Sequence, residues 1–204
     1  MTETRYMLKL IQGTFVPDEW HSEHGYEALL DFEISWILRL CSKNVAENYK
    51  KKKILIYQCR LILQKLTNID PNIVIDDVKV WRQWNCIDVI AEIYVGDVLH
   101  VLVLEDKAYT SMRQNQRDEY PKRVFDYYGK TPGKKIDFHF GVITFFESHE
   151  EEYKNLMSFV KKSDGFGPNN KYCWNVFSAT ALPDWDVDDY TESDLFNEFW
   201  FAKW

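Results

Sequence analysis

Three apolar, β-branched runs follow one another closely after Pro71, and they constrain the fold more than any other feature of the chain. They cover residues 73–84, 86–96 and 98–109, and Gly96-Asp97 is a turn signal between the last two. The segment VLHVLVLED of the third run is nearly all apolar, which is typical of a central strand covered on both faces. We therefore expect three sequential strands joined by tight turns.

The segments on either side of these strands alternate between helical and strand patterns. Before them, residues 25–40 repeat apolar side chains at spacings of three and four, and Asn44 is expected to cap a second helix that ends at Thr67. After them we expect a helix over residues 111–128 that is interrupted or bent near Pro121, and a strand over 136–146. A helix over 150–160, a strand over 172–180 and a short aromatic helix over 194–204 should follow. This order predicts one α/β domain over residues 1–204, a three-layer α-β-α sandwich with a central mixed sheet.

Composition and charge limit the class of protein. Aromatic residues form 16% of the 204-residue chain, which favours a packed structure over a disordered one. The formal net charge is −7, so any contact with nucleic acid must be local rather than driven by the whole molecule. The N-terminus lacks a signal-peptide pattern and no apolar run is long enough to cross a bilayer, so we expect a soluble, cytoplasmic protein with no membrane partner.

Cysteines and histidines do not form a metal-binding pattern. The five histidines have no ligand spacing, and a zinc site is therefore not expected. The four cysteines are scattered in apolar segments without a CxxC pair, which favours buried free thiols; they are Cys41, Cys59, Cys86 and Cys173.

Charged residues at the ends of two adjacent strands indicate a catalytic site. Asp88 lies in the strand CIDVIAEI, and the next strand ends in Glu105-Asp106-Lys107. Residues two apart on a strand share a face, so Glu105 and Lys107 should point to one side and Asp106 to the other. Two carboxylates suit Mg²⁺ or Mn²⁺, and an adjacent lysine suits the orientation of a water and the stabilisation of charge on a phosphoryl group.

The pattern of Asp88 followed by Glu105-Asp106-Lys107 resembles the D…ExK signature of the PD-(D/E)XK nuclease superfamily, with Ile87 in place of the usual proline. Gln116 and Tyr120 are similar to the Q-x-x-x-Y pattern that several branches of that superfamily place beside the metal site. The resemblance implies a restriction-endonuclease-like fold, in which a first-helix acid also lies near the metal.

These similarities imply a metal-dependent nuclease that acts on DNA, in bacterial or phage DNA processing or defence. Its catalytic residues would be Asp88, Glu105, Lys107 and Gln116, and its metal ligands Asp88, Glu105 and Glu33, with Glu27 or Asp31 as alternatives to Glu33. Arg113, Arg117 and Tyr120 would contact nucleic acid.

Other interpretations remain open at this point. Asp88 and Lys107 can be a structural salt bridge, with Glu105 merely ending its strand. The chain can be a catalytically silent nuclease-fold module that binds or assembles with protein, and DNA versus RNA, endo versus exo action and a homodimer are undecided. The aromatic tail is more typical of packing or a dimer contact than of base stacking; it contains Phe196, Phe199, Trp200, Phe201 and Trp204.

Overall fold

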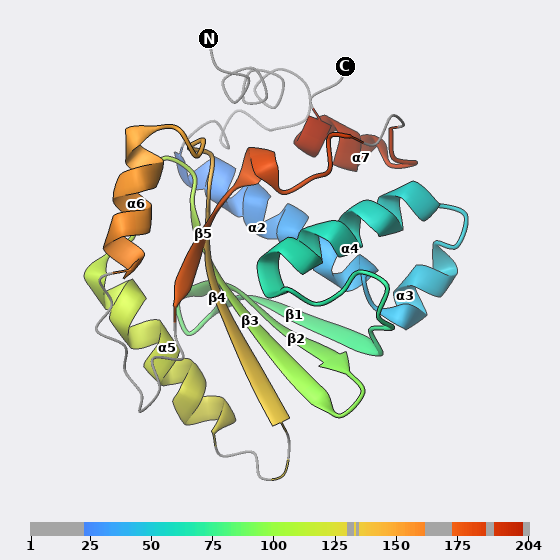
Figure 1. Ribbon diagram of the computed structural model, residues 1–204, viewed down its shortest axis with the longest axis horizontal. Helices are drawn as coiled ribbons and strands as arrows, with labels where there is room; N and C mark the ends of the chain where they lie inside the picture. The colour runs from blue at the N-terminus through green and yellow to red at the C-terminus, as the bar shows by residue number, and fades with distance from the viewer. Residues whose placement is uncertain (1–22, 130–132, 134, 162–172, 187–189, 202–204) are drawn as a thin grey trace.

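A mixed sheet forms the centre of the protein in the computed structural model, which describes residues 23–129, 133, 135–161, 173–186 and 190–201 (Figure 1). Its strands are β1 (Asp77–Trp84), β2 (Ile87–Val95), β3 (Val98–Lys107), β4 (Lys135–Thr144) and β5 (Trp174–Ser178), and they lie side by side in that order. The first three strands are antiparallel neighbours, whereas β4 runs parallel to β3 and β5 runs parallel to β4. The expected run of three sequential strands joined by tight turns is confirmed.

Helices cover both faces of this sheet (Figure 1). On one face lie α2 (Glu23–Leu40), α3 (Lys43–Asn48) and α4 (Lys53–Thr67), and on the other lie α5 (Gln114–Tyr128) and α6 (Glu151–Lys161). The chain is thus an α/β protein with a mixed sheet between helices, as the sequence predicted.

Burial of β3 on both faces explains its nearly continuous apolar sequence. Leu102 and Leu104 join the core under α2 and α4, whereas Val101 and Val103 join the core under α5 and α6. A strand with alternate side chains in two separate cores has no solvent face, so it takes apolar residues at almost every position. Its polar C-terminal end is therefore the exception that needs a chemical reason.

The C-terminal aromatic residues pack against the body of the protein. After the short helix η2 (Ala179–Ala181), the chain forms α7 (Asp194–Phe196) and the wider helical turn η3 (Asn197–Phe201). Phe196, Phe199, Trp200 and Phe201 are buried in the core beside α2 and α4. Packing is confirmed for these four residues; Trp204 lies outside the described residues.

The second predicted helix is wrong in one respect, because two helices replace it. The chain leaves α3 after Asn48 and re-enters a helix at Lys53, so the lysine-rich stretch forms the connection. Asn44 lies inside α3, and Ser42 occupies the position before its first residue, so Asn44 is not the cap. Helix α4 ends at Thr67 as predicted, with Asn68 in the left-handed conformation (φ 61°).

Burial of the cysteines was predicted correctly for only two of the four. Cys41 and Cys59 are buried free thiols between α2 and α4, but Cys86 and Cys173 are free and exposed. Cys86 lies in the turn between β1 and β2, and Cys173 immediately precedes β5. Cys86 and Cys173 have apolar neighbours in the sequence, but both lie at the ends of strands and are exposed there.

Pro121 does not interrupt α5, which continues from Gln114 to Tyr128. A proline has no N–H to donate to the carbonyl four residues earlier, which here belongs to Arg117. The indole N–H of Trp174, in β5, donates to that carbonyl at 3.0 Å. The side chain of a neighbouring strand therefore satisfies the backbone group that Pro121 leaves without its helical partner.

Residues 164–171 are rich in Gly, Pro and Asn, which indicates a loop, and they lie outside the described residues. Within the part of the chain that the structure does describe, no helix has the length and apolar character needed to cross a membrane.

Candidate active site

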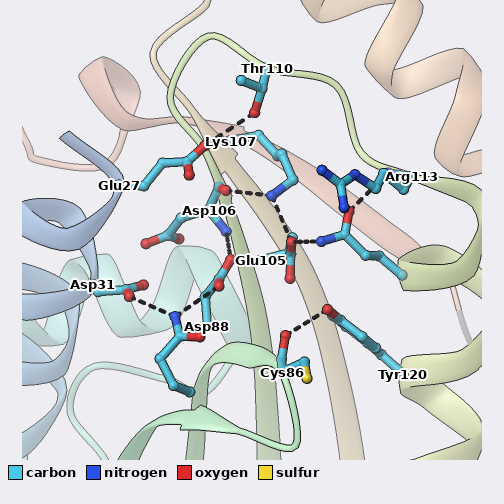
Figure 2. Close-up of polar contacts among 12 residues, drawn as sticks. Glu27, Asp31, Cys86, Asp88, Glu105, Asp106, Lys107, Thr110, Arg113 and Tyr120 are labelled. Carbon is cyan, nitrogen blue, oxygen red and sulfur yellow. Dashed lines mark hydrogen bonds and ion pairs between the residues drawn. The ribbon is translucent and has the colours of Figure 1, made fainter. Parts of the chain in front are cut away.

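The hairpin formed by β2 and β3 brings the three residues of the D…ExK pattern to one end of the sheet. The register pairs Val89 with Leu104, so Asp88 and Glu105 occupy the next step beyond that pair. Glu105 and Lys107 contact each other on one side of β3, whereas Asp106 lies on the side of α2 (Figure 2). This is the orientation that the two-residue period of a strand predicts.

Glu105 is the centre of the cluster. Its Oε1 lies 2.6 Å from Lys107 Nζ (Figure 2). The same oxygen also accepts a hydrogen bond from the side-chain amide of Gln116. Lys107 Nζ donates in addition to the carbonyl oxygen of Asp106 at 2.9 Å. Glu105 is 1% exposed and Lys107 is 8% exposed, so both charged groups are held away from bulk water.

Gln116 reaches this carboxylate from the first turn of α5. The amide oxygen of its side chain accepts from the backbone N–H of Arg113 at 2.9 Å, while its amide nitrogen points to Glu105. The two contacts use opposite ends of one amide and fix its orientation. The Gln116 position, expected from the resemblance alone, is therefore in contact with the strand residues.

Asp88 is held by the backbone and by a side chain that the sequence did not single out. Its Oδ2 accepts from the backbone N–H of Asp106 at 2.9 Å, and its Oδ1 accepts from Gln83 Nε2 at 3.0 Å. The same Gln83 nitrogen lies 3.3 Å from Asp31 Oδ2. Gln83 thus joins a carboxylate of α2 to one of β2, and its left-handed backbone (φ 55°) within β1 departs from regular strand geometry.

The first helix presents Asp31 and Glu27 to the cluster rather than Glu33. Asp31 lies beside Asp88 and Asp106, and Glu27 accepts from the Thr110 hydroxyl at 3.1 Å and adds negative charge near Lys107 (Figure 2). The structure does not bring Glu33 into this group.

Glu33 instead lies in the core between α2 and α4. It is 0% exposed, and neither carboxylate oxygen has a hydrogen-bond partner among the described residues. Its charge acts on Cys59, which is buried in the same core. Burial alone raises the pKa of Glu33 to about 8.

Crowded carboxylates shift the acids of the cluster toward their neutral forms. Burial and then the charge of Asp88 raise the pKa of Glu105 to about 8, against the opposing effect of Lys107. Burial, followed by the charges of Asp31 and Asp88, raises the pKa of Asp106 well above its usual value. Burial would lower the pKa of Lys107, but the contact with Glu105 outweighs it and raises that pKa. The cluster thus has more negative charge to accommodate than one lysine neutralises.

The predicted nucleic-acid contacts do not all face the cluster. Arg117 is paired with Asp118 at 2.7 Å, and its Nη1 donates to the carbonyl of Phe159 at 3.1 Å, on the side of α6. Tyr120 is buried, and its hydroxyl donates to the carbonyl of Cys86 at 2.6 Å (Figure 2). Arg113 is exposed at the start of α5, next to Gln116. Of the three, only Arg113 is both exposed and adjacent to the site.

A divalent cation is compatible with part of this arrangement. Glu105 Oε2 is buried without a hydrogen-bond partner among the described residues, and it lies beside Asp88, so two carboxylates could supply oxygen ligands. A group of three or more His, Cys, Asp or Glu side chains placed to hold an ion does not occur in the described ranges. Magnesium sites often use only one or two protein carboxylates, with water and substrate completing the coordination.

Fold and cluster together define an α/β protein with a buried carboxylate–lysine–amide group at the end of its central strand. No family model, curated protein or solved structure matches the chain.

Proposed function

We propose that the protein is a Mg²⁺- or Mn²⁺-dependent nuclease of the PD-(D/E)XK type with a restriction-endonuclease-like fold, which hydrolyses phosphodiester bonds of DNA. The observation that carries this proposal is the contact of Glu105 with Lys107 and Gln116, beside Asp88, at the end of a buried strand. Burial of several ionisable groups is unfavourable unless they are paired or bind an ion. A role in bacterial or phage DNA processing or defence is part of the proposal.

Each residue has a distinct role in this reaction. Asp88 and Glu105 would hold the cation, which supplies Lewis-acid polarisation of the phosphate and a more acidic water. The Lys107 ammonium would orient the attacking water and stabilise negative charge on the phosphoryl oxygens. As the water oxygen bonds to phosphorus, the bond from phosphorus to the leaving oxygen would break, and the proton lost by the water would reach the leaving oxygen through solvent. Gln116 and Gln83 would position Glu105 and Asp88 through the hydrogen bonds described above.

A cleavage assay with matched variants tests the proposal. Plasmid, linear duplex and single-stranded DNA, and RNA, are incubated with the protein and Mg²⁺ or Mn²⁺. We expect metal-dependent cleavage of at least one DNA form, and its loss in Asp88→Ala and Lys107→Ala. Lys122→Ala is the control, because Lys122 is a lysine of α5 that pairs with Glu119. Absence of cleavage of every substrate by a folded, metal-saturated protein would refute the proposal.

A second candidate function is a catalytically silent binding or assembly module. The observation that favours it is that Lys107 and Gln116 already occupy Glu105 Oε1, so that atom needs no ion to be satisfied. Such a module should show the same melting temperature with and without Mg²⁺ or Mn²⁺. A nuclease that binds the cation in its folded state should melt at a higher temperature when the ion is present.

A further inference from the structure

An open pocket of about 420 Å³ lies between the turn that joins β1 to β2 and the second half of α5. Its lining residues are Trp84, Asn85, Arg123, Asp126 and Tyr127. None of them belongs to the carboxylate cluster, yet the turn continues directly into the strand of Asp88. The pocket therefore adjoins the proposed catalytic site along the chain.

Two aromatic rings form its walls. The centroids of Trp84 and Tyr127 are 5.1 Å apart with the ring planes at 73°, so the pair forms a corner rather than a closed stack. Tyr127 is 58% exposed, although burial of a large aromatic side chain is normally favourable. A corner of this kind leaves ring surface against which another flat group can pack.

The turn that contributes Asn85 to the pocket has a left-handed backbone. Asn85 and Cys86 both have left-handed backbones, with φ of 50° and 68°, where side chains other than glycine are disfavoured. Arg123 Nη1 donates to the Asn85 carbonyl at 2.8 Å, and the Tyr120 hydroxyl donates to that of Cys86. Positive φ at both residues is the geometry of a two-residue hairpin turn between the paired Trp84 and Ile87, and helix α5 holds this turn in place.

Helix α5 also relates the pocket to the cluster. Gln116 contacts Glu105, Tyr120 is one turn further on, and Arg123 is almost another turn beyond. At about 1.5 Å per helical residue, Gln116 and Arg123 are separated by about 10 Å along the axis. Nucleotides rise by about 3.4 Å in a stacked strand and lie further apart in an unstacked one, so this separation spans at most about three nucleotides.

The charges favour a base over a phosphate as the occupant. Arg123 and Asp126 lie in the same pocket, so its formal charge is balanced and it would not select an anion. The Asp126 carboxylate can accept a hydrogen bond from the edge of a base, and Arg123 offers a guanidinium with several donors. Aromatic side chains with a neighbouring cation are the usual platform for unstacked bases.

Resting on the proposed nuclease function, we propose that this pocket binds one unpaired nucleobase of the strand whose phosphate lies at the catalytic cluster, within about three nucleotides of that phosphate. The protein would then act on single-stranded or locally opened nucleic acid, since a base within a duplex cannot enter the corner between Trp84 and Tyr127.

Binding of a fluorescently labelled DNA strand of about twelve nucleotides, with EDTA present to prevent cleavage, tests this proposal. A set of strands that each lack one base is compared with the intact strand, and an RNA strand and a blunt duplex form further arms. We expect one abasic position to weaken binding by about tenfold, as for loss of one stacked base. Trp84→Leu and Tyr127→Ala should weaken binding of the intact strand similarly, and should remove the penalty for the abasic position.

Trp185→Leu is the matched control, because Trp185 is 48% exposed but contacts Thr180 and Phe201. Its affinity should equal that of the wild type. Equal affinity of all abasic strands, or of Trp84→Leu and the wild type, would overturn the base-binding proposal. The proposal would also be overturned if Trp84→Leu lost self-association but still bound the DNA strand. The pocket would then be a contact between copies of the chain.

The outcomes separate this proposal from the nuclease function. Metal-dependent cleavage without any abasic effect would retain the nuclease and reject the pocket as a base site. A position-specific abasic effect without cleavage would retain base binding and reject the nuclease.

Discussion

Lys107 Nζ lies 2.6 Å from Glu105 Oε1, and both residues lie at the end of β3, the strand with the largest share of buried residues among the five described strands. The two side chains lie on the same side of β3, and Asp106, which lies between them in the sequence, points to the other side. Because Asp88 and Gln116 reach the same carboxylate from β2 and α5, the effect of each neighbour on Glu105 can be tested separately.

Removal of the Gln83 amide should weaken cation binding without loss of the fold. Gln83→Ala removes the donor to Asp88 and Asp31, and such indirect partners typically change metal affinity by about 10- to 100-fold. The change in Mn²⁺ affinity is measured by titration with Mn²⁺, using calorimetry and the cleavage rate as two readouts. Gln83→Gly should also bind Mn²⁺ more weakly, because it removes the same side-chain amide. This loss is expected even though glycine adopts the left-handed backbone conformation without strain. Lys79→Ala, on the same strand, is the control and should bind as the wild type does.

Cleavage should increase as the pH rises through about 8. The pKa of Glu105 is raised to about 8, so below that pH a proton competes with the cation for its carboxylate. A higher Mn²⁺ concentration should shift the midpoint of the pH–rate profile to lower pH. Rates measured from pH 6 to 9 at two metal concentrations check this; a profile that falls with rising pH, or a midpoint independent of metal, would contradict it.

Glu33→Gln should stabilise the protein at alkaline pH and leave it unchanged in acid. The folded pKa of about 8 exceeds the ordinary 4.5, so the neutral acid's contribution to stability is present below pH 4.5 and is lost as the pH rises toward 8. Glutamine has nearly the same shape and cannot ionise, so the variant should be more stable by up to a few kcal/mol at pH 9. Urea unfolding at pH 4.5 and 9 measures the difference.

Glu119 is half-buried and paired with Lys122, so Glu119→Gln serves as the control for this experiment and should show no such divergence between the two pH values. Equal stability of Glu33→Gln and the wild type at pH 9 would mean that the Glu33 carboxylate ionises in the folded protein without penalty.

Trp174→Phe should destabilise the protein by about 1 to 2 kcal/mol beyond its loss of packing, because the Arg117 carbonyl loses the indole donor. Pro121→Ala would supply a backbone N–H to the same carbonyl. Trp174→Phe should therefore be less destabilising in the Pro121→Ala background than alone. Urea unfolding of both single variants and the double variant measures this coupling; strictly additive effects would exclude a shared carbonyl.

The strands, their order along the chain and the meeting of Asp88, Glu105 and Lys107 could be predicted because they depend on local rules. Alternation along a strand and a short hairpin determine which side chains lie together. Gln116 was found through a resemblance, since nothing in its local sequence indicates which way its side chain points.

Other features depend on contacts that no local pattern encodes. Gln83 reaches Asp88 and Asp31 from a left-handed conformation within β1, which a strand pattern does not reveal. The choice between Asp31 and Glu33 depended on the rotation of α2 against the sheet. The apolar neighbours of Glu33 were a signal that it points into the core, whereas Asp31 and Glu27, four residues apart, share the face toward the cluster.

The most direct test of the central claim is the rate at which purified protein cleaves its best DNA substrate in Mg²⁺, for the wild type and for Glu105→Gln. Glutamine keeps the size of the side chain but removes the charge that would hold the cation. We expect metal-dependent cleavage by the wild type and a loss of at least about 100-fold in the variant, with the fold retained. Equal cleavage by both proteins, or cleavage by neither, would contradict a nuclease site at Glu105.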